Sequence, residues 1–203
     1  ILQIPAQIRY TLLPSPELSV LGLVKFSLPA IAQVFDRSLL VANFLTSTAV
    51  STEDPATLRA IPIPHPSIVQ DLLREVKQED PLHGYISIRT AHLGDKTAPR
   101  YLPLWILTYW SEVITLRAPD GPYTRWQDAE LYLQRWRQVW RTKNAGESHS
   151  LIDHIFENLA SVPWHGLIRG FDNGSEPLHE LATYASKRWL SDIHENQMLD
   201  LLR

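Results

Sequence analysis

The sequence of 203 residues contains no cysteine, and this absence excludes several kinds of function. Without cysteine there is no disulfide framework, no thiolate-bound zinc or iron–sulfur cluster, and no thiol nucleophile among these residues. The absence of disulfides fits an intracellular protein, whether inside or outside the nucleus. Glycine is scarce as well: the chain has eight, and none belongs to a GxxxxGK or GxGxxG loop that would hold phosphates.

A strong excess of positive charge is also absent, because 19 Lys and Arg stand against 22 Asp and Glu for a formal net charge of −3. Binding driven mainly by phosphate neutralisation is therefore not expected of the chain as a whole. The longest apolar stretch, Tyr101 to Leu116, is shorter than the roughly 20 residues that cross a bilayer. It predicts a buried core helix, and we expect no membrane partner.

The remaining chemistry-bearing residues form no catalytic or metal-binding motif. Eight histidines are present, but His149 and His154 are five positions apart and do not share a helix face. No HExxH or paired HxH motif occurs, and no serine lies in a Gly-x-Ser-x-Gly elbow. The sequence therefore predicts no catalytic residue, no metal and no cofactor within this chain.

The amino-acid composition of the first third of the chain differs from that of the rest. Eight of the fifteen prolines fall in the first 66 residues, whereas all seven tryptophans lie at or after Trp105. We expect a Pro-rich segment with one helix over 1–66, a helical domain over 67–175, and a third part over 176–203. The one helix of the first part is predicted at 29–46, followed by a loop and a Pro-alternating stretch to residue 66.

Hydrophobic spacing and capping patterns predict a mainly α fold, an irregular helical domain with one or two short strands. Two capping boxes are expected, Ser67 with Gln70 and Thr124 with Gln127. Helices are predicted at 67–79, 103–117, 124–143, 148–160 and from 176 onward, a strand at 85–90, an extended segment at 164–171, and turns at 119–122 and 172–175.

The predicted helix 124–143 allows two interpretations. Its apolar positions follow a 3-4-3-4 spacing that is typical of a packed helix pair, namely Trp126, Ala129, Leu133, Trp136 and Trp140. Its basic residues give a local positive excess, and they are Arg125, Arg135, Arg137, Arg141 and Lys143. These two features together suggest contact with nucleic acid or an acidic partner. The alternative is a core tryptophan stripe with a solvated charged face.

The segment Trp189 to Leu202, WLSDIHENQMLDLL, resembles the opening of the catalytic domain in ubiquitin-like-protein-specific cysteine proteases, the SUMO-deconjugating family. That family has a Trp-Leu-(Asn/Ser)-Asp pattern followed by a helix. Locally, Asp192 is suited to cap this helix, with Glu195 completing a capping box. Further segments resemble the amino-terminal region of a fungal, mobile-element-associated branch of such proteases: Leu102–Trp105, Tyr109-Trp110, Trp164–Gly166 and Glu176–His179.

The resemblance implies a ubiquitin-like modifier protein as partner and two substrate-binding residues. Trp189 matches the tryptophan that clamps the modifier's Gly-Gly tail, and Asp192 matches an acidic residue that pairs with a basic side chain of the modifier. The family's catalytic His, Asp, Gln and Cys lie further downstream than Arg203. We therefore expect an inactive fragment of a cysteine-type peptidase that ends at the start of a catalytic domain, which would be α+β if complete. A helical interaction or nucleic-acid-binding module and a structural domain of a mobile-element protein remain the alternatives.

Overall fold

The computed structural model describes residues 2–35, 41–78, 84–90, 99–142, 146–169, 176–188 and 190–201, without the side chains of 146–149 and 193. The predicted fold class is confirmed: the chain is mainly helical and has a small three-stranded antiparallel sheet. Within the described residues, no helix has both the length and the apolarity needed to cross a membrane. The chain forms two compact units, each built from two separate stretches: 1–13 with 27–115, and 14–26 with 116–203.

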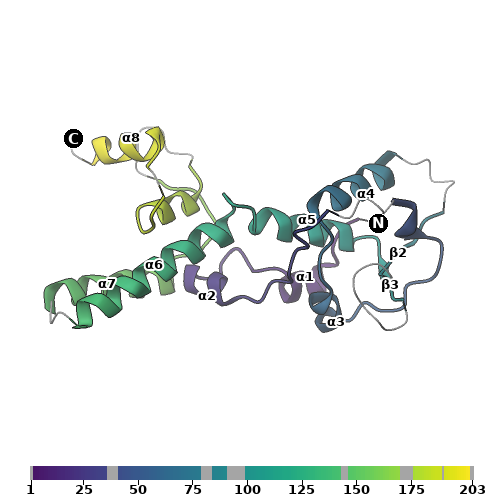
Figure 1. Cartoon of the computed structure of the whole chain (residues 1–203), viewed down its shortest axis with the longest axis horizontal. Helices are drawn as coiled ribbons and strands as arrows, with labels where there is room; N and C mark the ends of the chain where they lie inside the picture. The colour runs from purple at the N-terminus through teal and green to yellow at the C-terminus, as the bar shows by residue number, and fades with distance from the viewer. Residues whose placement is uncertain are drawn as a thin grey trace. The chain divides into compact units, whose positions relative to one another are not determined.

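The first of these, unit 1, places short helices around a small sheet and an apolar helix (Figure 1). Its strands β1 (Leu45–Thr46), β2 (Ser87–Arg89) and β3 (Tyr101–Pro103) pair in that order. Its helices are α1 (Ala6–Leu12), η1 (Val41–Asn43), α3 (Pro55–Ala60), α4 (Pro66–Gln78) and α5 (Ile106–Leu116), whose last residue clusters with the second unit.

Helix α5 supplies much of the core of unit 1, which confirms the prediction of a buried helix in the apolar stretch. Its side chains at Ile106, Tyr109, Trp110 and Val113 are fully buried. Helices α3 and α4 lie on opposite sides of α5 in Figure 1. The helix begins later than predicted, because Pro103 belongs to the edge strand β3, where the missing N–H of proline costs little.

Two predictions for the first 66 residues were wrong. The expected helix 29–46 is not formed in its described residues: Ile31 makes a parallel bridge to Ile63, and Leu45 pairs with Ile88 in the sheet. Here backbone pairing with distant segments outweighs a hydrophobic spacing that also suited a helix. The expected loop 46–66 contains helix α3, since the Asp54 carboxylate accepts the Thr57 N–H at 2.8 Å. With α1, α2 (Val20–Lys25) and α3, this part of the chain has more than the one helix predicted.

Helix α4 matches the prediction at 67–79, but its cap differs. The helix begins at Pro66, a favoured first position, and the His65 Nδ1 accepts the Ser67 N–H at 3.3 Å. Ser67 is therefore inside the helix, and the predicted box with Gln70 is wrong. The strand predicted at 85–90 is confirmed as β2.

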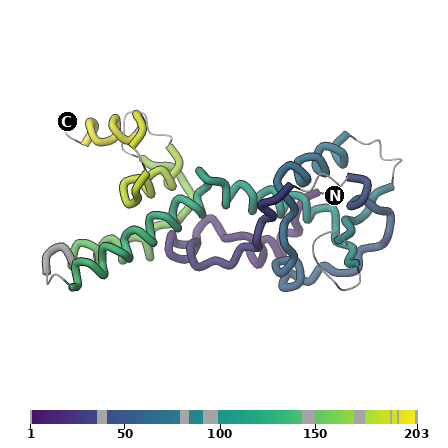
Figure 2. The backbone as a smooth tube through the Cα atoms, viewed as in Figure 1, coloured from purple at the N-terminus to yellow at the C-terminus, as the bar shows by residue number. Residues whose placement is uncertain are grey.

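The second, unit 2, is centred on two long helices, α6 (Pro122–Thr142) and α7 (Gly146–Ser161), which lie side by side in Figure 2. Both were predicted, although α6 begins before Thr124, so the box of Thr124 with Gln127 is wrong. Helix α2 packs against both. The stretch around α2 is held by Trp164, whose indole Nε1 donates to the Ser15 carbonyl at 2.7 Å.

The carboxyl-terminal part of unit 2 consists of η3 (Leu178–Thr183), a 3-10 helix, and α8 (Asp192–Asp200). They replace the single helix predicted from 176 onward. Within the predicted extended segment 164–171, Leu167 forms a bridge to Pro177. The predicted turn at 172–175 lies outside the described residues.

Replacing Trp110 by alanine should lower the free energy of unfolding by about 3–5 kcal/mol, because a fully buried indole leaves a large cavity. Urea unfolding followed by circular dichroism measures the change. Tyr10→Ala, at a side chain that is 56% exposed, is the control and should cost under about 0.5 kcal/mol. Equal losses for the two variants would contradict the assignment of the core.

Candidate functional site

Helix α8 is capped by a different residue from the one predicted. Ser191 is the N-cap, and its N–H donates to the His194 Nδ1 at 3.1 Å. Asp192 is the first residue of the helix and Glu195 does not complete the box, so this prediction was wrong. The signal was in the sequence: serine is as good a cap as aspartate, and a histidine three residues later can take the place of glutamate as acceptor.

The capping bond fixes the tautomer of His194, which is 2% exposed. A backbone N–H can only donate, so Nδ1 is the acceptor and the ring proton of the neutral imidazole lies on Nε2. From there it donates to the Glu180 carbonyl at 3.1 Å. One ring nitrogen therefore caps α8, and the other joins α8 to η3.

Glu180 is the centre of a polar cluster that connects three segments distant in sequence. The Arg125 guanidinium on α6 binds the Glu180 carboxylate, and the His194 Nε2 lies 3.7 Å from the same carboxylate. Only 15% of the Arg125 side chain and 14% of the Glu180 side chain are exposed. We call Arg125, Glu180 and His194 the Glu180 cluster.

The Glu180 cluster is built to hold structure rather than to perform chemistry. The ring nitrogens of His194 and the Glu180 carboxylate are already engaged within the protein. A general acid or base must instead reach a proton on a bound substrate. Across the part of the chain that the structure describes, no group of three His, Asp or Glu side chains is arranged to hold a metal ion.

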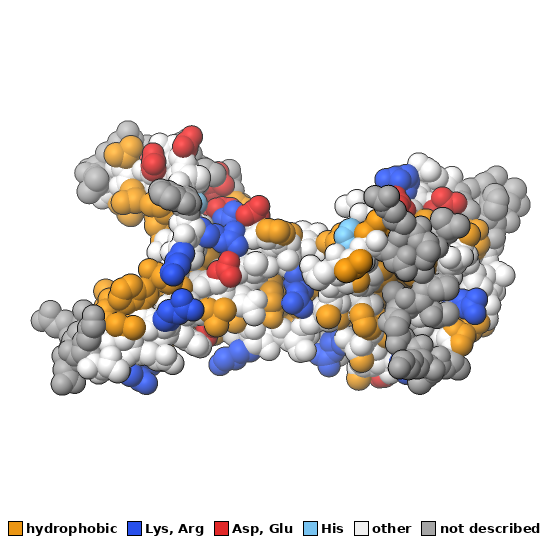
Figure 3. All heavy atoms as spheres, in the orientation of Figure 1, with side chains coloured by type: hydrophobic (Ala, Val, Ile, Leu, Met, Phe, Trp, Pro, Cys, Tyr) orange, Lys and Arg blue, Asp and Glu red, His pale blue; other side chains and the backbone are white. Residues whose placement is uncertain are grey.

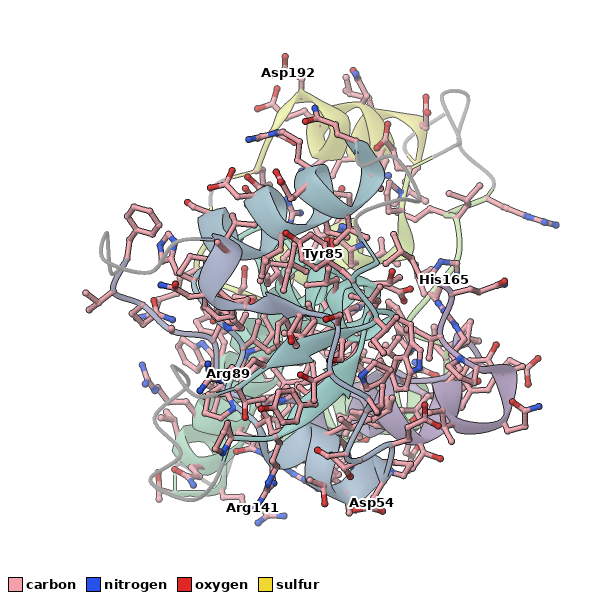
Figure 4. The ribbon with its side chains drawn as sticks, turned by 90° about the vertical axis from the view of Figure 1, so that its right-hand side faces the viewer. Asp54, Tyr85, Arg89, Arg141, His165 and Asp192 are labelled. Carbon is pink, nitrogen blue, oxygen red and sulfur yellow. The ribbon has the colours of Figure 1, made fainter. Side chains whose placement is uncertain are left out.

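The two residues that the resemblance implied have different outcomes. Trp189 lies outside the described residues, so its role in clamping a Gly-Gly tail stays a prediction. Asp192 is exposed at the first turn of α8, and Figure 4 shows its carboxylate at the outer end of that helix. Its predicted pairing with a basic side chain of a modifier stays a prediction.

The basic residues of α6 do not form one free cationic face. Arg125 is bound to Glu180, and Arg137 pairs with Asp153 on α7 at 2.5 Å while its guanidinium lies over the Phe156 ring. Arg135 is exposed, Arg141 lies at the end of α6 (Figure 4), and Lys143 lies outside the described residues. At least two of the five predicted nucleic-acid contacts are therefore neutralised within the protein.

The tryptophan seam of α6 is buried at one end and open at the other. Trp126 is 3% exposed and Leu133 7%, as predicted for a core stripe, whereas Trp136 is 38% exposed. Tyr132, Trp136 and Trp140 follow one another along the helix with ring centroids 6.2 and 5.7 Å apart, the first pair edge-to-face and the second tilted. The predicted seam contained Trp136 and Trp140 but not Tyr132, and its spacing did not indicate which of its residues would stay exposed.

This aromatic ladder lines a groove of about 400 Å³ on unit 2. Its walls include Tyr132, Trp136, Trp140, Leu151, Ile155 and Tyr184. In Figure 3, hydrophobic side chains cover the region of α6 and α7, with Lys and Arg side chains beside them. A second hollow of about 330 Å³ lies between η3 and α8, and Tyr184 lines both.

Comparison of the chain with family models, with curated proteins and with solved structures finds no match.

Replacing Glu180 by glutamine should lower the free energy of unfolding by about 3 kcal/mol, because the largely buried Arg125 charge loses its buried partner and keeps only the exposed Asp120, at 3.7 Å. Chemical denaturation of the whole chain measures the loss. The double variant Arg125→Met/Glu180→Gln should recover part of it. Asp71→Asn, which removes an exposed pair with Arg74, is the control and should cost under about 1 kcal/mol.

The stability of unit 2 should fall as the pH drops from 7.5 to 5.5. Burial lowers the pKa of His179 below 6.5, and Arg125 and His165 add to this while Glu180 opposes it. At pH values between the lowered pKa of His179 in the folded chain and its pKa in the unfolded chain, the unfolded state binds more protons than the folded state. The free energy of unfolding therefore decreases as the pH falls through this range. His179→Gln should make the free energy of unfolding depend less on pH, as measured by chemical denaturation at several pH values. His154→Gln, at an exposed histidine of α7, should leave it unchanged.

Proposed function

We propose that this chain is the substrate-binding, non-catalytic amino-terminal region of a cysteine-type peptidase that acts on ubiquitin-like modifiers. The observation that carries the proposal is the exposed Asp192 carboxylate at the start of α8, inside the segment that resembles the family. A cysteine-type peptidase needs a thiolate for cleavage, and this chain contains no cysteine, so the role we propose for it is binding.

The packing of α8 supports a binding role for Asp192. Its neighbour Ser191 is held by His194, and His194 is held by Glu180, so the first turn of the helix is fixed to η3. A carboxylate on a fixed turn loses little conformational freedom when it pairs with a basic side chain. By the resemblance, Trp189 lies three residues earlier and contacts the modifier's Gly-Gly tail.

A second candidate function is a protein-interaction module with no peptidase attached. The half-exposed aromatic ladder favours it, because large apolar side chains gathered on a surface are typical of interaction sites. Nucleic-acid binding is less well supported, because Arg125 and Arg137 are engaged in ion pairs.

The first proposal is tested by a calorimetric titration of the whole chain with a SUMO-type modifier that keeps its Gly-Gly tail. Asp192→Lys should weaken binding about tenfold, or about 1.4 kcal/mol, by replacing an attraction with a repulsion. The matched control is Glu195→Lys, an exposed acidic residue of the same turn, which should change the affinity less than twofold. Equal losses for both variants, or no binding, would contradict the proposal.

The proposal has a second requirement that does not depend on binding. The reading frame beyond Arg203 should encode a His, an Asp, a Gln and a Cys at family-like distances. Sequencing that frame checks it, and a frame without His and Cys would leave only the interaction module.

A further inference from the structure

The groove over the aromatic ladder exposes apolar side chains from two helices at once. Leu151 on α7 is 58% exposed and Trp136 on α6 is 38% exposed, and both line the groove. Leaving such side chains in water costs free energy that burial would recover. Gathered in one hollow rather than scattered, they indicate a site that a partner covers.

The lining indicates a macromolecular partner rather than a small polar ligand. Small-molecule sites combine an apolar wall with a few polar groups that fix orientation. Among the groove's described lining residues, the polar side-chain groups are the hydroxyls of Tyr132 and Tyr184 and the indole N–H groups of Trp136 and Trp140, and none of them carries a charge. The Tyr184 hydroxyl is already bonded to the His194 carbonyl and lies near the Gln197 amide oxygen.

The length of the groove suits a helix. From Tyr132 to Trp140 the ladder extends eight residues along α6, about 12 Å at 1.5 Å per residue. Two turns of a partner helix have nearly the same length, so anchors at i, i+4 and i+7 fit along the ladder. An amphipathic helix in an apolar groove is a recurring mode of peptide recognition.

Positive charge borders the groove on the side of Tyr132. A neighbouring hollow shares Tyr132 and is lined by Arg135, Lys187, Arg188 and Asp128. Arg188 is neutralised there, because it binds Asp128 at 2.9 Å and also lies 3.2 Å from Asp120. Arg135 and Lys187 are exposed, and neither forms an ion pair with a described acidic residue. The border is therefore net positive and complements a negatively charged partner.

We propose that the groove of Tyr132, Trp136, Trp140, Leu151, Ile155 and Tyr184 binds an acidic amphipathic helix of a partner protein. Apolar side chains of that helix contact the ladder, and its acidic side chains pair with Arg135 and Lys187. This site is separate from Asp192, and the proposal does not depend on the resemblance to peptidases.

The test uses the whole chain and three fluorescein-labelled peptides of equal length. Fluorescence anisotropy measures the binding of each peptide. The first peptide has leucines at i, i+4 and i+7 with glutamates beside them. The second replaces the glutamates by lysines, and the third keeps the first composition but scatters the leucines. We expect the first peptide to bind at least about tenfold more tightly than either of the others. Equal or tighter binding of the lysine or scattered peptide would overturn the proposal.

Matched variants locate the site. Leu151→Asp should weaken binding of the first peptide at least about tenfold. Leu167→Asp is the control, since Leu167 is a leucine of unit 2 with almost the same exposed fraction, 57%. Arg135→Glu and Lys187→Glu should each weaken binding several-fold, whereas Arg169→Glu, at another exposed arginine of unit 2, should not. Equal losses in test and control variants would overturn the proposal.

Two further readouts keep the test decisive if Leu151→Asp fails to fold. The indole N–H resonances of Trp136 and Trp140, assigned with Trp→Phe variants, should shift on addition of the first peptide, and unchanged resonances would overturn the proposal. A single-stranded oligonucleotide serves as a competitor, because bases also stack on exposed aromatic rings beside basic residues. Tighter binding of the oligonucleotide than of the acidic peptide, lost in Trp136→Ala, would assign the groove to nucleic acid instead.

Discussion

A carboxylate that is largely buried loses its hydration, and interactions within the protein must make up for this loss. At Glu180 these interactions come from α6 and α8. Arg125 supplies the opposite charge, and His194 joins the backbone of η3 to the first turn of α8. Removing either contact would leave a buried polar group unsatisfied, which costs more than the contact itself contributes. This cluster holds η3 against α6 and α8 against η3, and it thereby contributes to the placement of Asp192, Tyr184 and one wall of the groove.

The same helix α6 has a structural half and an open half. Near its start, Trp126, Ala129 and Leu133 are buried, while further along Trp136 is exposed to solvent. Its basic residues do not follow this division, because Arg125 and Arg137 are bound within the protein and Arg135, between them in the sequence, is exposed. One amphipathic sequence thus supplies both the core of unit 2 and a surface suited to a partner.

Local signals predicted α4, α5, α6 and α7 because each has a long hydrophobic period that backbone hydrogen bonding within the segment can satisfy. They failed where the backbone found a distant partner, as at Ile31 with Ile63 and Leu45 with Ile88. They also misplaced caps: His65 and Ser191 took the positions expected of Ser67 and Asp192. A cap depends on one residue of register, and hydrophobic spacing does not define a helix end so closely.

The sequence by itself determined the mainly helical class, the absence of thiol chemistry, the apolar core helix and the spacing of the tryptophans along α6. These follow from residue types and from spacing along one segment. Only the tertiary structure decided that His194 and Arg125 meet at Glu180, that Arg137 is neutralised by Asp153, and that Trp136 stays exposed while Trp126 does not. The physical reason is that burial and charge pairing are properties of neighbours in space, and these neighbours lie on different elements of the chain.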